Sequence, residues 1–391
     1  MPPVLPSTRV AVIVGAGIGG LAAAVALQQA GWRVRVLERA ATPRELGFAL
    51  LLAPNAVYAL RQLGVAAPVI AGGGVATNGE MRRADGTLLR RFELARLRTL
   101  LPEPTVTVLR PVLHGALLEA AGRDVLMLGS DVAGFVERED RVEVALRDGS
   151  SVEGDLVIGA DGVGSVVRGQ LHPDEPPPRT SGLFGLRGVN QGVAHHMRGA
   201  SGAQYFGRGI EAGLAWAGGS TVYWYMSVPR TLATAAGLDP QVVLSRASEE
   251  FDARFKAIVG ATAPHDMRLD ELFDREPIDT WGRGRVTLLG DAAHPMLPHA
   301  GQGAAQALED AVALGRRLSG AAPVDVALRD YERVRIARTR AVVQLARRNA
   351  RMSAIDGAIA CRLRDLVLRA LPERVILKQL VALGRPPKEH W

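Results

Sequence analysis

The sequence predicts an α/β fold in which a nucleotide-binding lobe with a parallel sheet is interleaved with a lobe built on an antiparallel sheet. Three observations lead to this prediction. The glycines of Gly15-x-Gly17-x-x-Gly20 separate an apolar strand from an apolar helix. Residues 285–310 repeat the order of strand, loop and helix near the other end of the chain. Residues 181–228 are rich in glycine and in aromatic side chains with a rough period of two, which is typical of antiparallel strands.

The N-terminal segment is predicted to form a strand–helix–strand unit. Residues 9–14 are a continuous apolar, β-branched run, as expected for a strand that is buried on both faces. A helix rich in Ala and Leu follows to Ala30, and Gly31 suits its C-terminal cap. Residues 34–37 form the second strand, which completes a nucleotide-binding unit of about 30 residues.

The later elements follow from apolar periodicity and from turn residues. Asp85-Gly86 and Asp148-Gly149 are typical of hairpin turns. The proline-rich segment 172–179 is a stiff candidate connection between the lobes. The remaining expected elements are helices at 54–63, 111–121 and 240–256, a hairpin at 79–93, strands over 132–158, a buried strand at 286–289, and helices from 304 onward.

The predicted domains are therefore interleaved along the chain. The 391 residues are ample for more than one core, and no internal repeat is visible. We assign a nucleotide-binding domain to 1–70, 105–172 and 275–345, a substrate domain to 71–104 and 173–274, and a C-terminal helical segment to 346–391.

Composition and charge argue against several classes of protein. Hydrophobic residues make up 48% and charged residues 22%, as in globular proteins. The net charge of +7 comes almost entirely from dispersed arginines, so nucleic-acid binding is not expected. Cys361 is the single cysteine, which excludes an internal disulfide, and the histidines show no metal-ligand spacing. We expect a cytoplasmic protein without a signal peptide, and no apolar run reaches the ~18 residues of a membrane span.

The glycine motif has the residues that a phosphate-binding turn requires. Gly15 permits the tight turn, Gly17 lets a pyrophosphate approach the backbone, and Gly20 lets the helix pack closely on the strand. With Ile18 and Gly19, the helix start offers free N–H groups and a positive dipole end to an anion. An ordinary glycine-rich turn without a ligand is the alternative.

Glu38 indicates what kind of nucleotide would bind. It ends the second strand 18 positions after Gly20, where an acidic side chain can hydrogen-bond a ribose diol. An acid there disfavours a 2′-phosphate, so the site suits FAD or NAD rather than NADP. A surface ion pair with Arg39 is the alternative.

Two polar segments lie near predicted helix starts. Arg110 begins a helix, where its charge opposes the dipole, so an anionic or flavin ligand would offset the conflict. A solvated arginine is the alternative. Asp161-Gly162 follows a buried strand, and Asp161 can cap the next helix, which is compatible with a structural part in cofactor binding.

The second strand–loop–helix segment adds a further ligand site. Gly290 and Asp291 end a strand where open α/β sheets bind ligands, and a carboxylate there can accept hydrogen bonds from a polyol. The helix that opens at Gly301-Gln302-Gly303 presents N–H groups to negative charge that develops on a reduced ring. A loop without a ligand is the alternative.

Candidate proton-transfer groups are few. His294 is expected to fix its loop, whereas His299 lies between Pro298 and Gly301, where a substrate can sit, and is an acid/base candidate. Tyr223 shares one strand face with Tyr225, and Trp224 lies on the other. Tyr205 and Tyr223 are also candidate bases, with plain core packing as the alternative for each aromatic residue.

In this order along nearly the whole chain, these motifs resemble the FAD-dependent aromatic hydroxylases. These are the single-component class A flavin monooxygenases, typified by para-hydroxybenzoate hydroxylase, salicylate hydroxylase and zeaxanthin epoxidase. The resemblance rests on Gly15-Ala-Gly-Ile-Gly-Gly20, Glu38-Arg39, Pro54-Asn55-Ala56, Leu60, Leu63-Gly64, Arg110, Leu113, Leu117, Asp155 to Gly162, Ser165, Arg168, Gly290-Asp-Ala-Ala-His-Pro295, Pro298, Gly301-Gln-Gly303 and Glu309-Asp310.

The resemblance implies a Rossmann-like domain with bound FAD, and NADH or NADPH and O₂ as co-substrates. Such an enzyme hydroxylates an aromatic or related electron-rich small molecule through a flavin C4a-hydroperoxide. The chain would act as a monomer or homodimer, and membrane contact is not expected. By resemblance, Glu38 binds the adenosine ribose, Arg110 helps to hold the cofactor and Asp291 contacts the ribityl chain. The other implied cofactor contacts are Gly15, Gly17, Ile18, Gly19, Gly20, Arg39, Val132, Asp161, Gly162, Gly290, Pro298, Gly301, Gln302 and Gly303.

Two alternatives to this function stay open at the level of sequence. One is an FAD-dependent epoxidase or dehydrogenase on an isoprenoid or polyketide, and the other is a non-catalytic flavin-binding regulator. The stretch 362–380 alternates arginine with apolar residues, so it is either a basic amphipathic helix at a membrane or a helix that covers a core. One departure concerns Gly47-Phe48-Ala49-Leu50, where the family commonly has Gly-Ala-Gly-Ile. Phe48 and Ala49 add bulk near the expected flavin.

Overall fold

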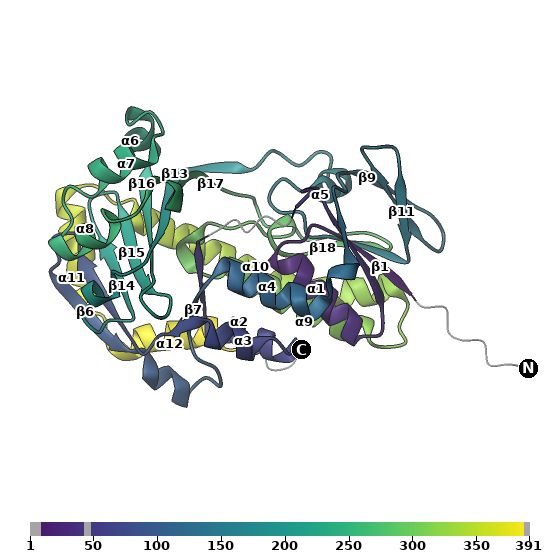
Figure 1. Cartoon of the computed structure of the whole chain (residues 1–391), viewed down its shortest axis with the longest axis horizontal. Helices are drawn as coiled ribbons and strands as arrows, with labels where there is room; N and C mark the ends of the chain where they lie inside the picture. Colours follow the sequence, from purple (N-terminus) through teal and green to yellow (C-terminus); the bar gives the residue numbers. More distant parts are fainter. Residues whose placement is uncertain (1–8, 43–47, 387–391) are drawn as a thin grey trace, which may run out of the picture.

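A computed structural model describes residues 9–42 and 48–386 and contains two principal sheets, as predicted (Figure 1). The first has five parallel strands in the order β18-β12-β1-β2-β8. Strand β1 lies in the centre, so the chain extends the sheet in both directions from it. Ligands bind at such a switch point, beyond the carboxyl ends of the strands. The strands are β1 (Val10–Val14), β2 (Arg33–Glu38), β8 (Leu126–Leu128), β12 (Leu156–Gly159) and β18 (Val286–Leu288).

Three helices pack closely together beside the parallel sheet. Helix α1 (Ile18–Gln29) contacts β1 and β2, and also contacts α4 (Arg110–Ala121) and α9 (Gly303–Leu318). It ends before Gly31, whose φ of +82° suits the predicted glycine cap. Gly315 lets α9 approach α1, because a Cβ there would lie 2.8 Å from the Cβ of Ala26.

The second large sheet has seven strands in the order β17-β13-β16-β15-β14-β5-β6. All its pairings are antiparallel except β14 with β5. One of its faces packs on helices, and the hydrophobic core between them is separate from the core of the parallel sheet. The strands are β5 (Asn78–Arg83), β6 (Leu88–Glu93), β13 (Arg179–Asn190), β14 (Gly202–Phe206), β15 (Glu211–Trp216), β16 (Val222–Pro229) and β17 (Met267–Asp274). The helices are α6 (Arg230–Ala235), α7 (Pro240–Ala247) and α8 (Ala253–Val259).

Smaller elements complete the chain. Helix α10 (Val324–Ser353) extends from the parallel sheet, where the Tyr331 hydroxyl donates to the carbonyl of Leu288 (3.1 Å), toward the seven-stranded sheet (Figure 1). The other helices are α2 (Pro54–Gln62), α3 (Ala66–Ala71), α5 (Val166–Leu171), α11 (Ala358–Ala370) and α12 (Glu373–Gly384). Two three-stranded antiparallel sheets comprise β9 (Val132–Glu137), β10 (Val142–Leu146) and β11 (Ser151–Gly154), and β3 (Ala49–Leu52), β7 (Val106–Leu109) and β4 (Gly73–Val75).

Two sequence-based assignments of helices are wrong in extent. The predicted helix at 240–256 is interrupted after Ala247, because Asp252 caps a new helix by accepting the N–H of Phe255 (2.8 Å). The stretch 362–380 is not one helix either, since α11 ends at Ala370 and Pro372 precedes α12.

The predicted domain ranges remain a proposal. The strands of the parallel sheet lie within the ranges assigned to the nucleotide-binding domain, and those of the seven-stranded sheet within the substrate domain. Strand β4 falls in the substrate range but pairs with β7 of the other domain. We propose that the two lobes are divided as the sequence suggests and joined by this small sheet.

The close approach of α9 to α1 can be tested by adding a methyl group at the contact between the two helices. We expect Gly315→Ala to lower the free energy of unfolding by about 1–3 kcal/mol, because the added methyl meets Ala26. Gly115→Ala in α4 is the matched control, since Gly115 is exposed and no atom lies within 4 Å of the new Cβ. It should be neutral or stabilise by about 0.5–1 kcal/mol. Urea unfolding measures both, and equal effects would contradict the assigned contact.

Candidate active site

We infer a cleft between the two lobes from charged side chains that are exposed to solvent and yet surrounded by protein. Asp291 follows β18 and Arg110 begins α4, and both are exposed to solvent. Even so, burial raises the pKa of Asp291 and lowers the pKa of Arg110. A side chain meets both conditions when it faces a hollow that is surrounded by protein. Arg110 is attracted by Asp291 and repelled by Arg187 and Arg268 of the seven-stranded sheet, so the lobes meet at this cleft.

The glycine turn lies at the carboxyl end of β1. A Cβ on Gly20 would lie 1.9 Å from the carbonyl oxygen of Gly15, so close packing requires glycine there. Gly15 itself has a φ of +103°. Gly17 differs from both, because a Cβ on it would meet nothing within 4 Å. The open side of Gly17 therefore faces free space at the start of α1, where no side chain caps the helix N–H groups.

Glu38 lies against the glycine turn. Its carboxylate accepts the main-chain N–H groups of Ala16 and Ala40, each at 3.0 Å. The turn is held on its other side by His114, whose Nε2 lies 2.8 Å from the carbonyl of Ala16. Arg39 is exposed beside Glu38. The structure thus brings the acid and the glycines together, as the ribose–phosphate interpretation requires.

Asp161 caps a helix and keeps one oxygen unpaired. Its Oδ2 accepts the N–H of Val166 at the start of α5 (2.7 Å), whereas Oδ1 is buried without a partner among the described residues. Burial accordingly raises the pKa of Asp161. Gly162 adopts a φ of +80° with open space at its Cβ position. An unpaired buried oxygen beside open space is suited to a ligand donor.

The segment 290–303 is anchored by the buried Arg168. Its guanidinium donates to the carbonyls of Ala292 (2.8 Å) and Ala293 (2.7 Å) and pairs with Glu175 (2.6 Å). Gly290 has a φ of +63° and donates its N–H to Asp310 (3.0 Å). These contacts fix Asp291 at the edge of the cleft.

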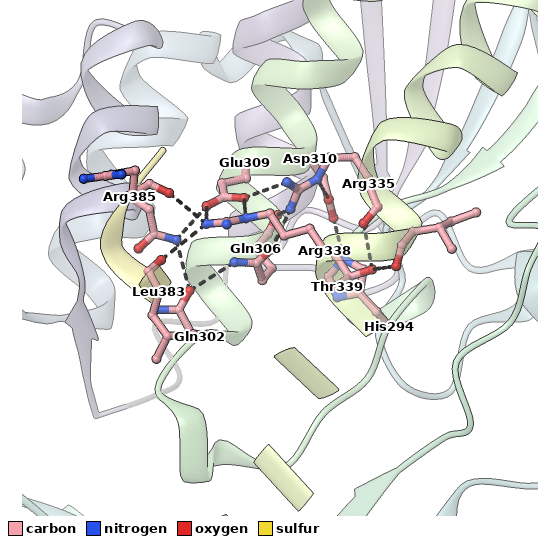
Figure 2. Close-up of polar contacts among 12 residues, drawn as sticks. His294, Gln302, Gln306, Glu309, Asp310, Arg335, Arg338, Thr339, Leu383 and Arg385 are labelled. Carbon is pink, nitrogen blue, oxygen red and sulfur yellow. Dashed lines mark hydrogen bonds and ion pairs between the residues drawn. The ribbon is translucent and has the colours of Figure 1, made fainter. Parts of the chain in front are cut away.

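A buried polar network between α9 and α10 supports the same segment (Figure 2). Arg335 of α10 contacts Asp310 (2.7 Å) and Glu309 (2.6 Å) of α9, and all three side chains are almost fully buried. His294 lies 2.6 Å from Asp310, which confirms that it fixes its loop. Burial acts to raise the pKa of Asp310, but His294 and Arg335 bring it below its ordinary value.

The helix start at Gly301–Gly303 belongs to this network. Gly301 has a φ of +60°, and α9 begins at Gly303. The buried side chain of Gln302 accepts a hydrogen bond from Asn55 of α2 (3.0 Å). A Cβ on Gly303 would lie 4.0 Å from Asp291 Oδ1, so the carboxylate is close to the helix start.

Tyr223, Tyr225 and His299 lie on the cleft side of the seven-stranded sheet. The rings of Tyr223 and Tyr225 lie 6.2 Å apart, and burial raises the pKa of Tyr223 to about 12. His299 Nε2 lies 3.0 Å from the hydroxyl of Ser227, two positions further along the same strand face. Burial lowers the pKa of His299 to about 4, and its Nδ1 has no partner among the described residues. Pro298, its neighbour, is exposed.

Tyr205 lies outside the cleft, and two further expected site residues can offer a ligand only their main chains. Tyr205 is fully buried on the opposite face of the sheet, where its ring packs on Phe255 (5.2 Å) as core. The side chain of Val132 is also core, which leaves only its main chain to a cofactor. Gly19 faces the side chain of Leu289, 2.7 Å from where a Cβ would lie. Packing explains the positions of the Tyr205 and Val132 side chains and the small residue at position 19.

Polar residues that the sequence analysis missed lie on the cleft face. Arg187 is opposite Tyr225 in the sheet register and pairs with Asp270 (2.8 Å). Glu211 is buried, accepts hydrogen bonds from Gln204 (2.8 Å) and Tyr225 (3.2 Å), and burial raises its pKa to about 7. The sequence signal that could have found these residues is a charged side chain within an otherwise apolar strand.

The departure at 47–50 is only partly visible, because Gly47 lies outside the described residues. The carbonyl of Phe48 accepts the N–H of Arg110 (2.9 Å), so this segment is next to the cleft. Ala49 pairs with Leu109 in the small sheet. Among residues 9–42 and 48–386, no cluster of side chains suits a metal ion, and no helix is long and apolar enough to cross a bilayer.

Known proteins share this arrangement. A family model described as an FAD binding domain matches residues 7–346. Aurachin C monooxygenase/isomerase of Stigmatella aurantiaca is 34% identical, over 92% of this chain and 93% of that protein. FAD-dependent urate hydroxylase of Klebsiella pneumoniae is 33% identical, over 86% and 88%. The solved structure of Klebsiella pneumoniae HpxO complexed with FAD and uric acid has a TM-score of 0.88 at 29% identity and covers 96% of each chain.

The two kinds of glycine in the turn should respond differently to a methyl group. We expect Gly17→Ala to leave the unfolding midpoint of the apoprotein unchanged, because its Cβ position is open, but to weaken FAD binding by about tenfold or more. Gly20→Ala is the comparison, since its Cβ would collide with Gly15 and destabilise the fold itself. Fluorescence titration with FAD and thermal unfolding of the apoprotein separate the two effects. Unchanged FAD affinity in Gly17→Ala would refute the assigned phosphate position.

Proposed function

The chain belongs to the family of FAD-dependent aromatic hydroxylases, and from this premise we propose that it uses NADH or NADPH and O₂ to hydroxylate an electron-rich aromatic compound bound in the cleft. It is an FAD-dependent monooxygenase. The observation that carries the site assignment is the set of polar side chains that are accessible yet desolvated. Asp291 and Arg110 are exposed and His299 and Tyr223 are half-buried, and burial shifts the pKa of all four at the junction of the lobes.

The residues present fit FAD. The open side of Gly17 and the uncapped start of α1 suit its pyrophosphate, and Glu38 suits the adenosine ribose. The unpaired Oδ1 of Asp161 provides an acceptor, and Asp291 would hold the ribityl chain beside the start of α9. When bound, the flavin supplies the redox and oxygen-activating chemistry.

The protein's own side chains would bind the substrate and exclude water. Tyr223 and His299 are uncharged near neutral pH, because burial holds the first protonated and the second deprotonated. His299 is too weak a base to keep a substrate proton, so its free Nδ1 is suited to a hydrogen bond with a ring substituent. Arg187, which is paired with Asp270, is a charged side chain near Tyr223. Enclosure by the two lobes limits the access of water.

The function is tested by anaerobic reduction. Protein loaded with FAD is mixed with NADH or NADPH, with and without members of a panel of phenols, hydroxybenzoates, quinolones, purines and isoprenoids. We expect one aromatic class to accelerate loss of oxidised-flavin absorbance, and its hydroxylated product to form when O₂ is admitted. If no compound accelerates reduction and no nicotinamide bleaches the flavin, the proposal fails.

The role of His299 predicts a particular pH dependence. Because the pKa of His299 is about 4, its protonation should not lower kcat/KM between about pH 8 and about pH 5. The pH profiles of the unmodified protein and of His299→Ala should therefore have the same shape in that range. The variant should nevertheless lose about 10- to 100-fold in kcat/KM at every pH in that range, since a buried hydrogen bond is removed. Tyr205→Phe is the control and should be neutral, because its hydroxyl is an unpaired core group. An acid limb near pH 6.5 that vanishes in His299→Ala would contradict this assignment.

A further inference from the structure

Helix α11 carries a stripe of large apolar side chains on the face that points to solvent. Ile359, Leu363, Leu366 and Val367 are 85%, 61%, 63% and 51% exposed. With about 100° of rotation per residue, the four positions fall within an arc of about 100° on one side of the helix. A surface helix ordinarily turns its large apolar side chains toward the core, so an exposed stripe of this size is a feature to be explained.

The inner face of α11 buries Cys361 and Leu368 and also holds a polar cluster. Asp365 contacts both Arg364 (3.0 Å) and Arg83 (3.1 Å). Arg364 also donates to the carbonyl of Gly207 (3.0 Å) and lies 5.3 Å from the ring centroid of Phe206. These contacts fix the orientation of α11 about its own axis. Rotating the helix to bury the apolar stripe would break the contacts of Arg364 and Asp365.

The exposed charges of α11 are both positive. Arg362 and Arg369 lie about 20° apart around the helix and border one edge of the apolar stripe. The single acid of the helix, Asp365, is buried in the inner cluster. The nearest exposed acid before the helix is Asp356, which precedes its first turn. An apolar stripe edged by arginines is complementary to an anionic lipid surface, where shallow insertion and phosphate contacts occur together.

A second copy of the chain fits this face less well. In an antiparallel two-fold contact of α11 with itself, Arg362 and Arg369 would face the same two arginines of the partner, with no exposed acid on the helix. The charge pattern therefore favours a lipid partner over self-association.

We propose that α11 is an interfacial helix that docks the enzyme on an anionic bilayer. The four apolar side chains enter the headgroup region, and Arg362 and Arg369 contact lipid phosphates. The proposal does not depend on the proposed reaction. It also changes the sequence-based interpretation of 362–380, since the lipid-facing element is Ala358–Ala370 and Arg364 belongs to its inner face.

Vesicle flotation of the full chain loaded with FAD tests this proposal. We expect binding to vesicles of phosphatidylcholine mixed with phosphatidylglycerol, weaker binding to phosphatidylcholine alone, and loss of binding at high salt. Leu363→Glu combined with Leu366→Glu should abolish binding. Arg362→Gln combined with Arg369→Gln should lower the partition coefficient by roughly tenfold on the anionic vesicles only. Val326→Glu is the matched control, because Val326 is a similarly exposed residue on another helix.

Three results would overturn the proposal. The first is no binding of the unmodified chain to anionic vesicles, and the second is binding that none of the α11 variants reduces. The third is a dimer in light scattering that Leu366→Glu converts to a monomer, since the occupant would then be a second copy. FAD content and the unfolding midpoint of each variant distinguish lost docking from a lost fold.

Discussion

The structure depends on one buried arginine. Arg335 lies between Glu309 and Asp310, two adjacent carboxylates that have almost no contact with solvent (Figure 2). Burial opposes the charge on Arg335, but the two carboxylates raise its pKa above its already high value. Buried charges of this kind cost several kcal/mol when a partner is missing, so α9 and α10 must remain in register. Asn55 and Arg338 complete the hydrogen bonds of Glu309.

Helix α10 connects this buried network to the other lobe. Its 30 residues span about 45 Å, from the network at Arg335 to the seven-stranded sheet. Near its far end, Asn349 donates to the carbonyl of His299 (3.0 Å), Arg347 pairs with Asp274 of β17 (2.6 Å), and Ser353 hydrogen-bonds Glu211. One helix therefore positions the loop at the cofactor side of the cleft and the sheet on the other side. Reaction geometry in such an enzyme depends on holding these two surfaces together.

The cleft face of the seven-stranded sheet is polar but largely uncharged, in contrast to Asp291 and Arg110 on the other side. Burial keeps His299 neutral and keeps Tyr223 and Tyr225 protonated, while Arg187 is balanced by Asp270. Glu211 is the exception, because its pKa of about 7 lets its charge change near neutrality. Such a surface provides hydrogen bonds for orientation without fixed charges that would hold water.

The sequence by itself determined the nucleotide-binding half of the protein. Gly15, Gly17, Gly20, Glu38 and Asp291 could be singled out as candidates because each satisfies a local requirement, such as a positive φ, a close backbone approach or a strand end. The order of these local signals also identified the parallel sheet and the family. The C-terminal helix break at Pro372 is a local signal too, and the alternation of arginine with apolar residues concealed it.

Only the tertiary structure decided which side chains share the cleft. Tyr205 and Tyr223 have similar sequence surroundings, yet the pairing of β14 and β16 through β15 puts one in the core and the other in the cleft. Arg187 and Asp270 meet because β13 and β17 are neighbours, although 83 residues separate them. The inward Arg364–Asp365 pair likewise depends on contacts with β14 and β5. Strand register and long-range ion pairs join residues that are distant in the chain, so no local pattern specifies them.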